Sequence, residues 1–419
     1  MKTLIKKIVP PALVPLLTRI RFCGRDKAGW LEARRRHMEA ELKLPPVADY
    51  ASPIDVTIGI IKDPMLLHQY YVYACREMKV RYRLCDVFGA GWYEECVRNN
   101  ECAAFLVAPR LFSRAWRQMY DERLRVIAES GKILFPSYEE LWMYESKRRM
   151  SYWVESHGFD GPKTHVFYSY LDAMDFAGRT ALPIVAKTDA GYAAQGVHIF
   201  RDRSEVMKHV RRCFNKGLRL DMGAFHPLVE NGFVLFQEYV STPIEWRLIR
   251  LGDSYFAHQK LKSGDFHSGS HLVGRIPPGR AHLDLIRRVT EVGGFRSLNV
   301  DVFELDDGRL LVNELQALPC MIKPFQMVLN GYPGRYLYDA SGDRWLFEKG
   351  TFCENKGSNL RLQALLAGLG HRVEIPRGSW EGVLTEEIRE ESIRRYKEYS
   401  GERSFEKMSE APVHVESQV

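Results

Sequence analysis

The chain has 419 residues, of which 45% are hydrophobic and 27% charged, and its formal net charge is +7. This composition is ordinary for a globular protein, and the length predicts two or three domains with a sizeable core. The positive charge is spread along the chain and no nucleic-acid-binding motif stands out. The balance therefore favours anionic small molecules or a membrane surface over a dedicated nucleic-acid binder.

The cysteines are scattered along the chain, and no two of them have the C-x-x-C spacing. Most lie within apolar runs, as buried reduced thiols do. We therefore expect no disulfide framework and a cytoplasmic protein. The eight cysteines are Cys23, Cys75, Cys85, Cys96, Cys102, Cys213, Cys320 and Cys353.

Residues 1–22 are both basic and apolar. Their longest uncharged run, residues 8–18, is too short to span a bilayer and contains three prolines. Two hypotheses stay open: a peripheral contact with the inner face of a membrane, or a segment packed on the body of the protein or on a partner subunit. The opening also resembles the N-termini of some enzymes from bacterial surface-polysaccharide gene clusters.

Residues 51–137 alternate apolar strand-like runs with helical patterns. This alternation is typical of βαβ units and a parallel sheet, so we predict an N-terminal α/β domain. No G-x-G-x-x-G follows the first strand, which leaves a dinucleotide site unsupported. The predicted strands are Asp55–Ile61, Val80–Cys85, Ala103–Val107 and Lys132–Phe135, and the predicted helices are Leu66–Met78, Trp92–Arg98 and Ala115–Ser130.

A β-hairpin is predicted where Asp307 and Gly308 separate two apolar runs, because Asp-Gly suits the positive φ of a tight hairpin turn. We place its strands at Leu298–Leu305 and Leu310–Gln316. With a two-residue loop, Asp306 pairs with Arg309, Phe303 with Val312, and Asp301 with Glu314.

Directly opposed residues lie on one face of a sheet, and Gln316 points the same way as Glu314. The two carboxylates and the amide oxygen of Asp301, Glu314 and Gln316 are ligands that suit Mg²⁺. The alternative is a solvated hairpin with polar residues on its wet face.

Two further strands carry charged residues near their ends. Lys187 ends the run 182–187, beside a loop that contains Gly191 and Gly196. An ammonium group and loop amides suit phosphate, although such a lysine is also common as a solvated residue. The next two runs, 233–240 and 244–251, contain Glu238 and Glu245. Backbone groups after Glu238 can hydrogen-bond to the edge of adenine, and Glu245 can accept hydrogen bonds from ribose hydroxyls. The alternative is a surface hairpin that carries a ladder of Arg and Glu side chains.

Five features in chain order resemble the ATP-grasp superfamily over residues 138–324. They are Lys147 ahead of Gly161-Pro-Lys-Thr164, the strand lysine Lys187, the strand end Gln237-Glu238-Tyr239-Val240, Glu245 within Ile-Glu-Trp-Arg, and Asp301 with Asn313-Glu314-Leu315-Gln316. Three features depart from the superfamily: Gln316 stands where Asn is usual, the phosphate loop is poor in glycine, and residues 317–321 replace a small-Pro-Gly ending.

The resemblance implies an α/β fold that is α+β in its C-terminal half. An N-terminal βαβ parallel-sheet domain would precede an ATP-grasp fold of two α+β subdomains that clasp the nucleotide. We divide the chain into an N-terminal segment and helix (1–50), an α/β domain (51–137), an ATP-grasp domain (138–350) and a C-terminal extension with a charged helix and loose tail (351–419).

The implied cofactors are ATP and Mg²⁺, and each candidate residue takes a role by resemblance. Lys147 and Lys187 would hold the α- and β-phosphates. Adenosine would be held by Gln237, Glu238, Val240 and Glu245, and one or two Mg²⁺ by Asp301, Glu314 and Gln316. The transferred phosphoryl group would meet Lys260 and Arg275.

The implied activity is ATP-dependent ligation, in which a carboxylate becomes an acyl phosphate and an amine or other nucleophile displaces phosphate. The partners would be a small-molecule carboxylate and amine, in surface-polysaccharide or specialised metabolite synthesis, with no nucleic acid. The alternatives are a kinase acting on a hydroxyl group and a non-catalytic nucleotide-binding protein. The sequence leaves the oligomeric state and both substrates open.

Overall fold

The structure is a computed structural model that describes residues 36–37, 39–98, 101–111, 113–191, 195–220, 228–241, 244–262, 272–319, 321–376 and 378–402. Several sequence predictions lie outside these residues: the basic segment 1–22, Cys23, Cys320 and the loose tail. Within the described part, no helix is both long and apolar enough to cross a membrane.

The N-terminal part is a four-stranded parallel sheet with the order β2-β1-β3-β4, as the alternating pattern predicted. Its core positions are continuously apolar because a parallel sheet is covered on both faces. Gly59 is needed in β1, since a Cβ there would lie 2.3 Å from the ring of Phe105. The elements are β1 (Thr57–Ile61), α4 (Gln69–Glu77), β2 (Arg81–Cys85), η2 (Glu94–Arg98), β3 (Ala104–Leu106), α5 (Arg114–Glu129) and β4 (Ile133–Phe135). The predicted helix at 92–98 is a π-helix over its last five residues.

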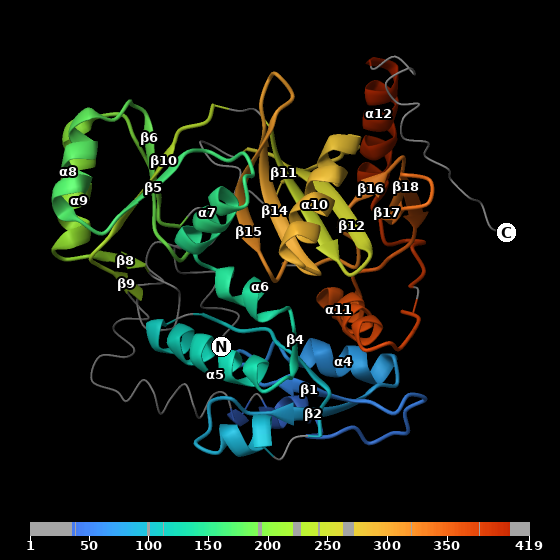
Figure 1. The fold of residues 1–419 in the computed structure, drawn as a ribbon. Helices are drawn as coiled ribbons and strands as arrows, with labels where there is room; N and C mark the ends of the chain where they lie inside the picture. Colours follow the sequence, from blue (N-terminus) through green and yellow to red (C-terminus); the bar gives the residue numbers. More distant parts are fainter. Residues whose placement is uncertain are drawn as a thin grey trace, which may run out of the picture.

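A second unit contains a four-stranded antiparallel sheet with the order β5-β10-β6-β7, covered on one face by α8 and α9 (Figure 1). A two-stranded sheet, β8-β9, lies below it in this view. The elements are β5 (Thr164–Phe167), α8 (Tyr170–Arg179), β6 (Ile184–Lys187), β7 (Val197–Phe200), α9 (Arg203–Phe214), β8 (Leu218–Leu220), β9 (Leu228–Glu230) and β10 (Val234–Glu238).

The third unit is an eight-stranded sheet whose main path is β15-β14-β11-β12-β17-β16. Helix α10 packs on β11, β12 and β14, and α12 lies against β16 (Figure 1). The elements are β11 (Ile244–Leu251), β12 (Ser254–Lys260), β13 (Val273–Gly274), α10 (Arg280–Gly293), β14 (Ser297–Glu304), β15 (Leu310–Gln316), β16 (Val328–Leu329), β17 (Tyr332–Asp339), β18 (Arg344–Lys349), α11 (Glu354–Gly368) and α12 (Glu386–Glu402).

Helix α7 (Lys147–Ser156) stands between the second unit and β15, and the short helix α6 (Tyr138–Met143) lies below α7 and above α5 (Figure 1). Glu140 holds α6 in place: its Oε2 accepts the amide of Ser137 at 2.6 Å, and its Oε1 accepts the amides of Arg296 and Ser297 at 3.0 and 2.7 Å. The turn that leads into α7 is therefore fixed relative to the start of β14.

The β14–β15 hairpin has the predicted strands but a different turn. The amide of Leu305 donates to the Arg309 carbonyl at 2.9 Å, and Gly308 has a φ of +83°, so the loop has three residues. The predicted Asp306–Arg309 pair is therefore wrong, and Phe303 pairs with Leu311 instead of Val312.

A register shift between Asp301 and Val302 then restores the predicted pairing, and Asp301 faces Glu314. Asn313 is the extra residue on β15 at this point, because Val302 pairs with Val312 and Asp301 with Glu314. A bulge changes the direction of the local side chains, and Asn313 becomes important in the site.

Candidate functional site: two lysines beside a buried ion-pair cluster

Two lysines predicted to bind phosphate approach the β14–β15 hairpin from different elements. Lys187 ends β6, and its Nζ donates to Oδ1 of Asn313 at 2.9 Å. Lys147 begins α7, and its Nζ donates to the carbonyl of Gly191 at 3.0 Å and lies 3.7 Å from Oε1 of Glu314. Both ammonium groups thus hydrogen-bond to neutral oxygens at the place where three segments meet.

The charge of Lys187 is poorly compensated. Burial lowers the pKa of Lys187 to about 8, and the charge of Glu314 only partly opposes this effect. An ammonium group that is partly desolvated and bonded to an amide oxygen favours the arrival of an anion. The structure brings the two predicted lysines and Glu314 together.

Backbone amides of the loop after Lys187 were expected to add donors for phosphate. Two of them are already occupied, because the amides of Asp189 and Ala190 each donate to Glu230 at 2.7 Å. The expectation is therefore wrong for these two residues. The tip of the loop, residues 192–194, lies outside the described part of the chain.

A buried ion-pair cluster lies next to the lysines on β11, β12 and β14. Arg247 donates to both oxygens of Asp301 at 2.8 Å, and Lys260 Nζ donates to Asp301 Oδ2 at 2.8 Å and also bonds to Glu245. Asp301 is 1% exposed and Glu245 4%. We call Glu245, Arg247, Lys260 and Asp301 the ion-pair cluster.

Opposing effects set the pKa values in this cluster. Burial by itself would raise the pKa of Asp301, but the charges of Arg247 and Lys260 outweigh it and hold that pKa well below its usual range. Burial raises the pKa of Glu245, and Lys260 only partly opposes this. The cluster thus contains two acidic and two basic side chains whose charges compensate one another.

The predicted Mg²⁺ ligands Asp301, Glu314 and Gln316 are bonded to other side chains and to the backbone. Both oxygens of Asp301 are bonded to cationic side chains, and Gln316 turns its Oε1 toward the amide of Glu145 at 3.2 Å while its Nε2 donates to Glu314 Oε1 at 3.0 Å. Among the described residues, no group of three or more His, Cys, Asp or Glu side chains is placed to hold a metal ion. The metal-binding roles of Asp301, Glu314 and Gln316 stay predictions.

Of the predicted adenosine-binding residues, Gln237 and Glu238 end β10, Val240 follows it, and Glu245 lies on β11. Gln237 is buried, and its Nε2 donates to Thr164 Oγ1 at 3.1 Å, so its side chain is structural. Glu238 is exposed, and its amide donates to the Lys163 carbonyl at 2.9 Å. Val240 follows the strand and is half-buried. The adenosine-binding roles stay predictions, including that of Glu245, which is bonded to Lys260.

Arg275, proposed with Lys260 to meet the transferred phosphoryl group, lies close to α12. Its Nε is 4.0 Å from Glu391, and burial lowers the pKa of Arg275. His258 on β12 shares this region: its Nδ1 is buried without a hydrogen bond, and burial, with the charge of Arg247 nearby, lowers its pKa to about 3.

Sequence reasoning missed the residues that hold the lysines and acids in place: Asn313, Arg247, Asp189 and Glu230. Asn313 and Arg247 lie within the motifs, but the motifs assign them no role. Their contacts come from a β-bulge and from a non-local strand pairing. No sequence signal links Asp189 to Glu230, which are 41 residues apart.

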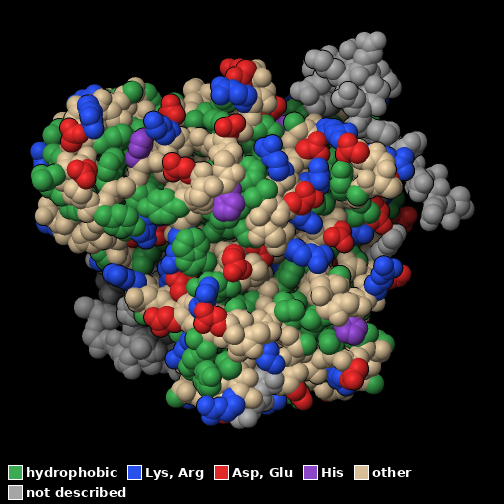
Figure 2. Space-filling model, in the orientation of Figure 1, with side chains coloured by type: hydrophobic (Ala, Val, Ile, Leu, Met, Phe, Trp, Pro, Cys, Tyr) green, Lys and Arg blue, Asp and Glu red, His purple; other side chains and the backbone are tan. Residues whose placement is uncertain are grey.

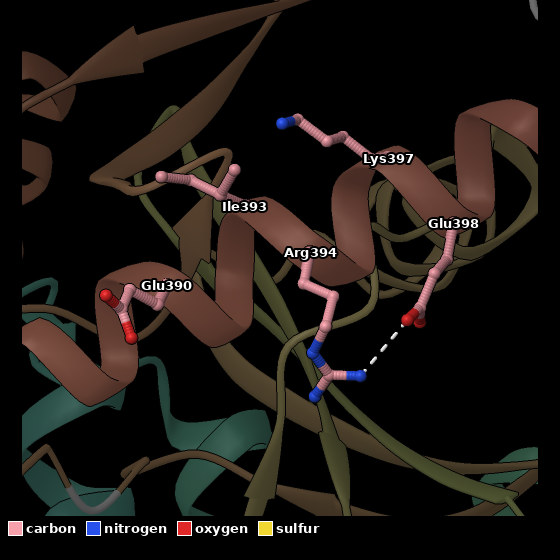
Figure 3. Close-up of a pocket in the computed structure, with 5 residues that line it drawn as sticks. All are labelled: Glu390, Ile393, Arg394, Lys397 and Glu398. Carbon is pink, nitrogen blue, oxygen red and sulfur yellow. Dashed lines mark hydrogen bonds and ion pairs between the residues drawn. The ribbon is translucent and has the colours of Figure 1, made fainter.

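On the face shown in Figure 2, basic and acidic side chains are interspersed. An open hollow of about 360 Å³ runs along α12 (Figure 3). The exposed Arg394 and Glu398 form an ion pair across it at 3.0 Å. The lining residues are Glu390, Ile393, Arg394, Lys397 and Glu398, and none of the predicted site residues is among them.

Comparison with known proteins finds no matching family model and no matching curated relative. Solved structures do resemble the chain. PurK, an N5-carboxyaminoimidazole ribonucleotide synthetase in its ADP complex, is 13% identical with a TM-score of 0.46, over 64% of this chain and 71% of PurK.

A RimK domain ATP-grasp protein from Sphaerobacter thermophilus is 15% identical with a TM-score of 0.46, over 62% of this chain and 90% of that protein. The D-alanine–D-alanine ligase of Bacillus anthracis, complexed with ATP, is 14% identical with a TM-score of 0.43, over 64% and 87%. These likenesses involve ligases and an ATP-grasp protein, the superfamily that the motifs resemble. Because every TM-score is below 0.5, we base the functional assignment on the geometry of the site.

Proposed function

We propose that this chain is an ATP-grasp enzyme that activates a carboxylate with ATP and joins it to an amine or another nucleophile. The observation that carries the proposal is the convergence of Lys147 and Lys187, from two separate elements, with both ammonium groups bonded to neutral oxygens. Polyphosphate is an anion that two such cations can bind together.

The residues of the chain would act mainly by binding and alignment. Lys147 and Lys187 neutralise phosphate oxygens, and the buried ion-pair cluster lies next to them. A carboxylate oxygen of the acid substrate then attacks the γ-phosphorus and ADP leaves. The nucleophile attacks the carbonyl carbon of the acyl phosphate, and inorganic phosphate leaves with the bonding electron pair.

Lys260 is more a positioning residue than a free cation in this proposal, because Glu245 and Asp301 already bind it. The edge after Glu238 and the half-buried Val240 provide the surface for adenine. The acid substrate is unassigned. The N-terminal resemblance makes sugar acids and amino-acid decorations of surface polysaccharides the first compounds for a substrate panel.

The first test is calorimetric binding of ATP, ADP and adenosine, with and without Mg²⁺, by wild type and Lys147→Ala. A ligand at about 100 times its Kd should raise the free energy of unfolding by about 2.7 kcal/mol, which thermal unfolding can check. We expect ATP and ADP to bind, and Lys147→Ala to weaken both. No stabilisation of wild type by any adenine nucleotide would refute the proposal.

The second test identifies the reaction. The protein is incubated with ATP and panels of acids and amines, and ADP and phosphate are measured. A ligase releases both with formation of an amide, and hydroxylamine should trap the acyl phosphate as a hydroxamate. A stable phosphate ester of an alcohol would instead identify a kinase, and binding without turnover a non-catalytic protein.

A further inference from the structure

Two buried carboxylates hold the backbone that follows Lys187. Glu230 on β9 is 9% exposed, and its two oxygens accept the amides of Asp189 and Ala190, both at 2.7 Å. A carboxylate that accepts two consecutive amides forms charge-assisted hydrogen bonds, which are shorter and stronger than neutral ones. Glu230 therefore fixes the backbone direction immediately after the lysine.

The second carboxylate, Asp189, joins this backbone to the start of α7. Its Oδ1 accepts Ser146 Oγ at 2.8 Å and the amide of Arg148 at 3.0 Å, and its Oδ2 accepts Arg148 Nη2 at 2.9 Å. The carbonyl of Asp189 also accepts the amide of Lys147 at 3.0 Å. The residues on both sides of Lys147, and the backbone of Lys147 itself, are thus bonded to a residue two positions after Lys187.

Close packing fixes the base of the same loop. The amide of Thr188 donates to the Gly196 carbonyl at 3.0 Å. Gly196 has a φ of +78°, and a Cβ there would lie 2.0 Å from Thr188 Oγ1, so only glycine fits. The loop base has little freedom to move and can transmit a displacement of Glu230 to the lysines.

We propose that Glu230 and Asp189 are positioning residues that set the separation of Lys147 and Lys187 for binding the phosphates of a nucleotide. Neither carboxylate needs to touch the ligand: Glu230 occupies two amides, and Asp189 joins the loop to α7. This inference rests on the proposed nucleotide site and names residues that nothing else assigns to it. It requires that losing either carboxylate weaken the binding of phosphates much more than the binding of adenosine.

The test compares Glu230→Gln with wild type. An amide group cannot accept both backbone N–H groups, because its Nε2 is a donor. We expect at least a tenfold loss of affinity for ATP and for ADP by calorimetry, and adenosine affinity within twofold of wild type by ligand-observed NMR. Glu205→Gln is the matched control, since Glu205 is exposed on α9 and pairs with Lys208 at 2.7 Å; its affinities should not change.

If Glu230 had a purely structural role, Glu230→Gln would lower the melting temperature and weaken the binding of ATP, ADP and adenosine to the same extent. That result would overturn the inference. ATP affinity within twofold of wild type in Glu230→Gln would do so too. If wild type itself binds no adenine nucleotide, the proposed function fails instead, and the two failures are distinguishable.

Asp189→Asn provides a second variant in case Glu230→Gln does not fold. It keeps the size of the side chain but removes an acceptor from Ser146 and Arg148, and we expect the same selective loss of ATP and ADP affinity. Because both carboxylates act on one loop, the double variant should lose less than the product of the two single effects. Independent, fully multiplicative losses would contradict a shared positioning role.

Discussion

The two groups of charged residues in the candidate site differ in how their charges are balanced. In the ion-pair cluster, Arg247 and Lys260 are bonded to Asp301 and Glu245, and the charges cancel within a buried volume. In the lysine pair, Lys147 and Lys187 donate to a carbonyl and to a side-chain amide oxygen, and the one nearby carboxylate, Glu314 at 3.7 Å from Lys147, balances only one of the two charges. The first group is complete without a ligand, whereas the second leaves positive charge for an anion.

Because of this difference, substitutions in the ion-pair cluster should change folding stability, whereas substitutions in the lysine pair should change ligand affinity. Removing one member of a complete buried cluster leaves an uncompensated charge, which costs folding free energy. Removing an uncompensated lysine costs little stability and takes away ligand affinity. Lysines of the two groups are therefore expected to give opposite results on substitution.

The largest expected effect is that of Asp301→Asn, which leaves Arg247 and Lys260 with one carboxylate between them. We expect the free energy of unfolding to fall by about 3–5 kcal/mol, because breaking a buried ion pair leaves a charge unpaired. Denaturant titration measures it. Asp307→Asn on the same hairpin is the control, since its pair with Arg309 is exposed. A loss below about 1 kcal/mol in Asp301→Asn would mean that the cluster is not structurally required.

The next effect is that of Lys187→Met, which should abolish measurable ATP binding, a loss of about 100-fold or more (~2.7 kcal/mol). The melting temperature without ligand should stay equal or rise, because burial already disfavours the ammonium. Calorimetry and thermal unfolding measure the two quantities. Lys208→Met, at an exposed pair on α9, should change neither. ATP affinity close to wild type in Lys187→Met would remove this lysine from the site.

A third prediction concerns pH. Lys187 has a pKa of about 8 in the free protein, and bound phosphate should raise it, so binding takes up a proton above pH 8. ATP affinity should be constant below about pH 7, be about twofold weaker at pH 8, and fall by up to about tenfold per pH unit above that. In Lys187→Arg the guanidinium stays charged, so the profile should be flat. Equal slopes in the two proteins would show that another group titrates.

The same contrast explains what the sequence could predict. Local patterns placed β11 and β15 at their observed ends, and the predicted pairing of Asp301 with Glu314 is present, although a β-bulge and not the turn geometry produces it. The order of motifs identified Lys147 and Lys187, which do converge. These predictions depend on neighbouring residues and on spacing along the chain.

The state of each charge could not be predicted, because it depends on which strands become neighbours. Arg247 reaches Asp301 through the pairing of β11 with β14, two strands separated in the sequence by β12, β13 and α10, and no sequence pattern indicated that contact. Asn313 meets Lys187 because of a bulge that also corrected the register error at the turn. Non-local pairing and irregular backbone decide such contacts, and propensity does not encode them.

The smallest predicted effect concerns an exposed ion pair, which serves as the reference for the ion-pair cluster and the lysine pair. Arg394 and Glu398 form an ion pair at 3.0 Å on α12, with side chains 57% and 42% exposed (Figure 3). An exposed pair four residues apart on a helix stabilises by about 0.3–0.5 kcal/mol, because water screens it and ordering two long side chains costs entropy. Arg394→Ala should therefore change the free energy of unfolding by less than about 0.5 kcal/mol, and ATP affinity not at all, since none of the site residues lines that hollow. Denaturant titration and calorimetry measure both. A loss above about 1 kcal/mol would show that exposed pairs in this protein contribute as much as buried ones, and the distinction between a complete cluster and an open lysine pair would then lose its energetic basis.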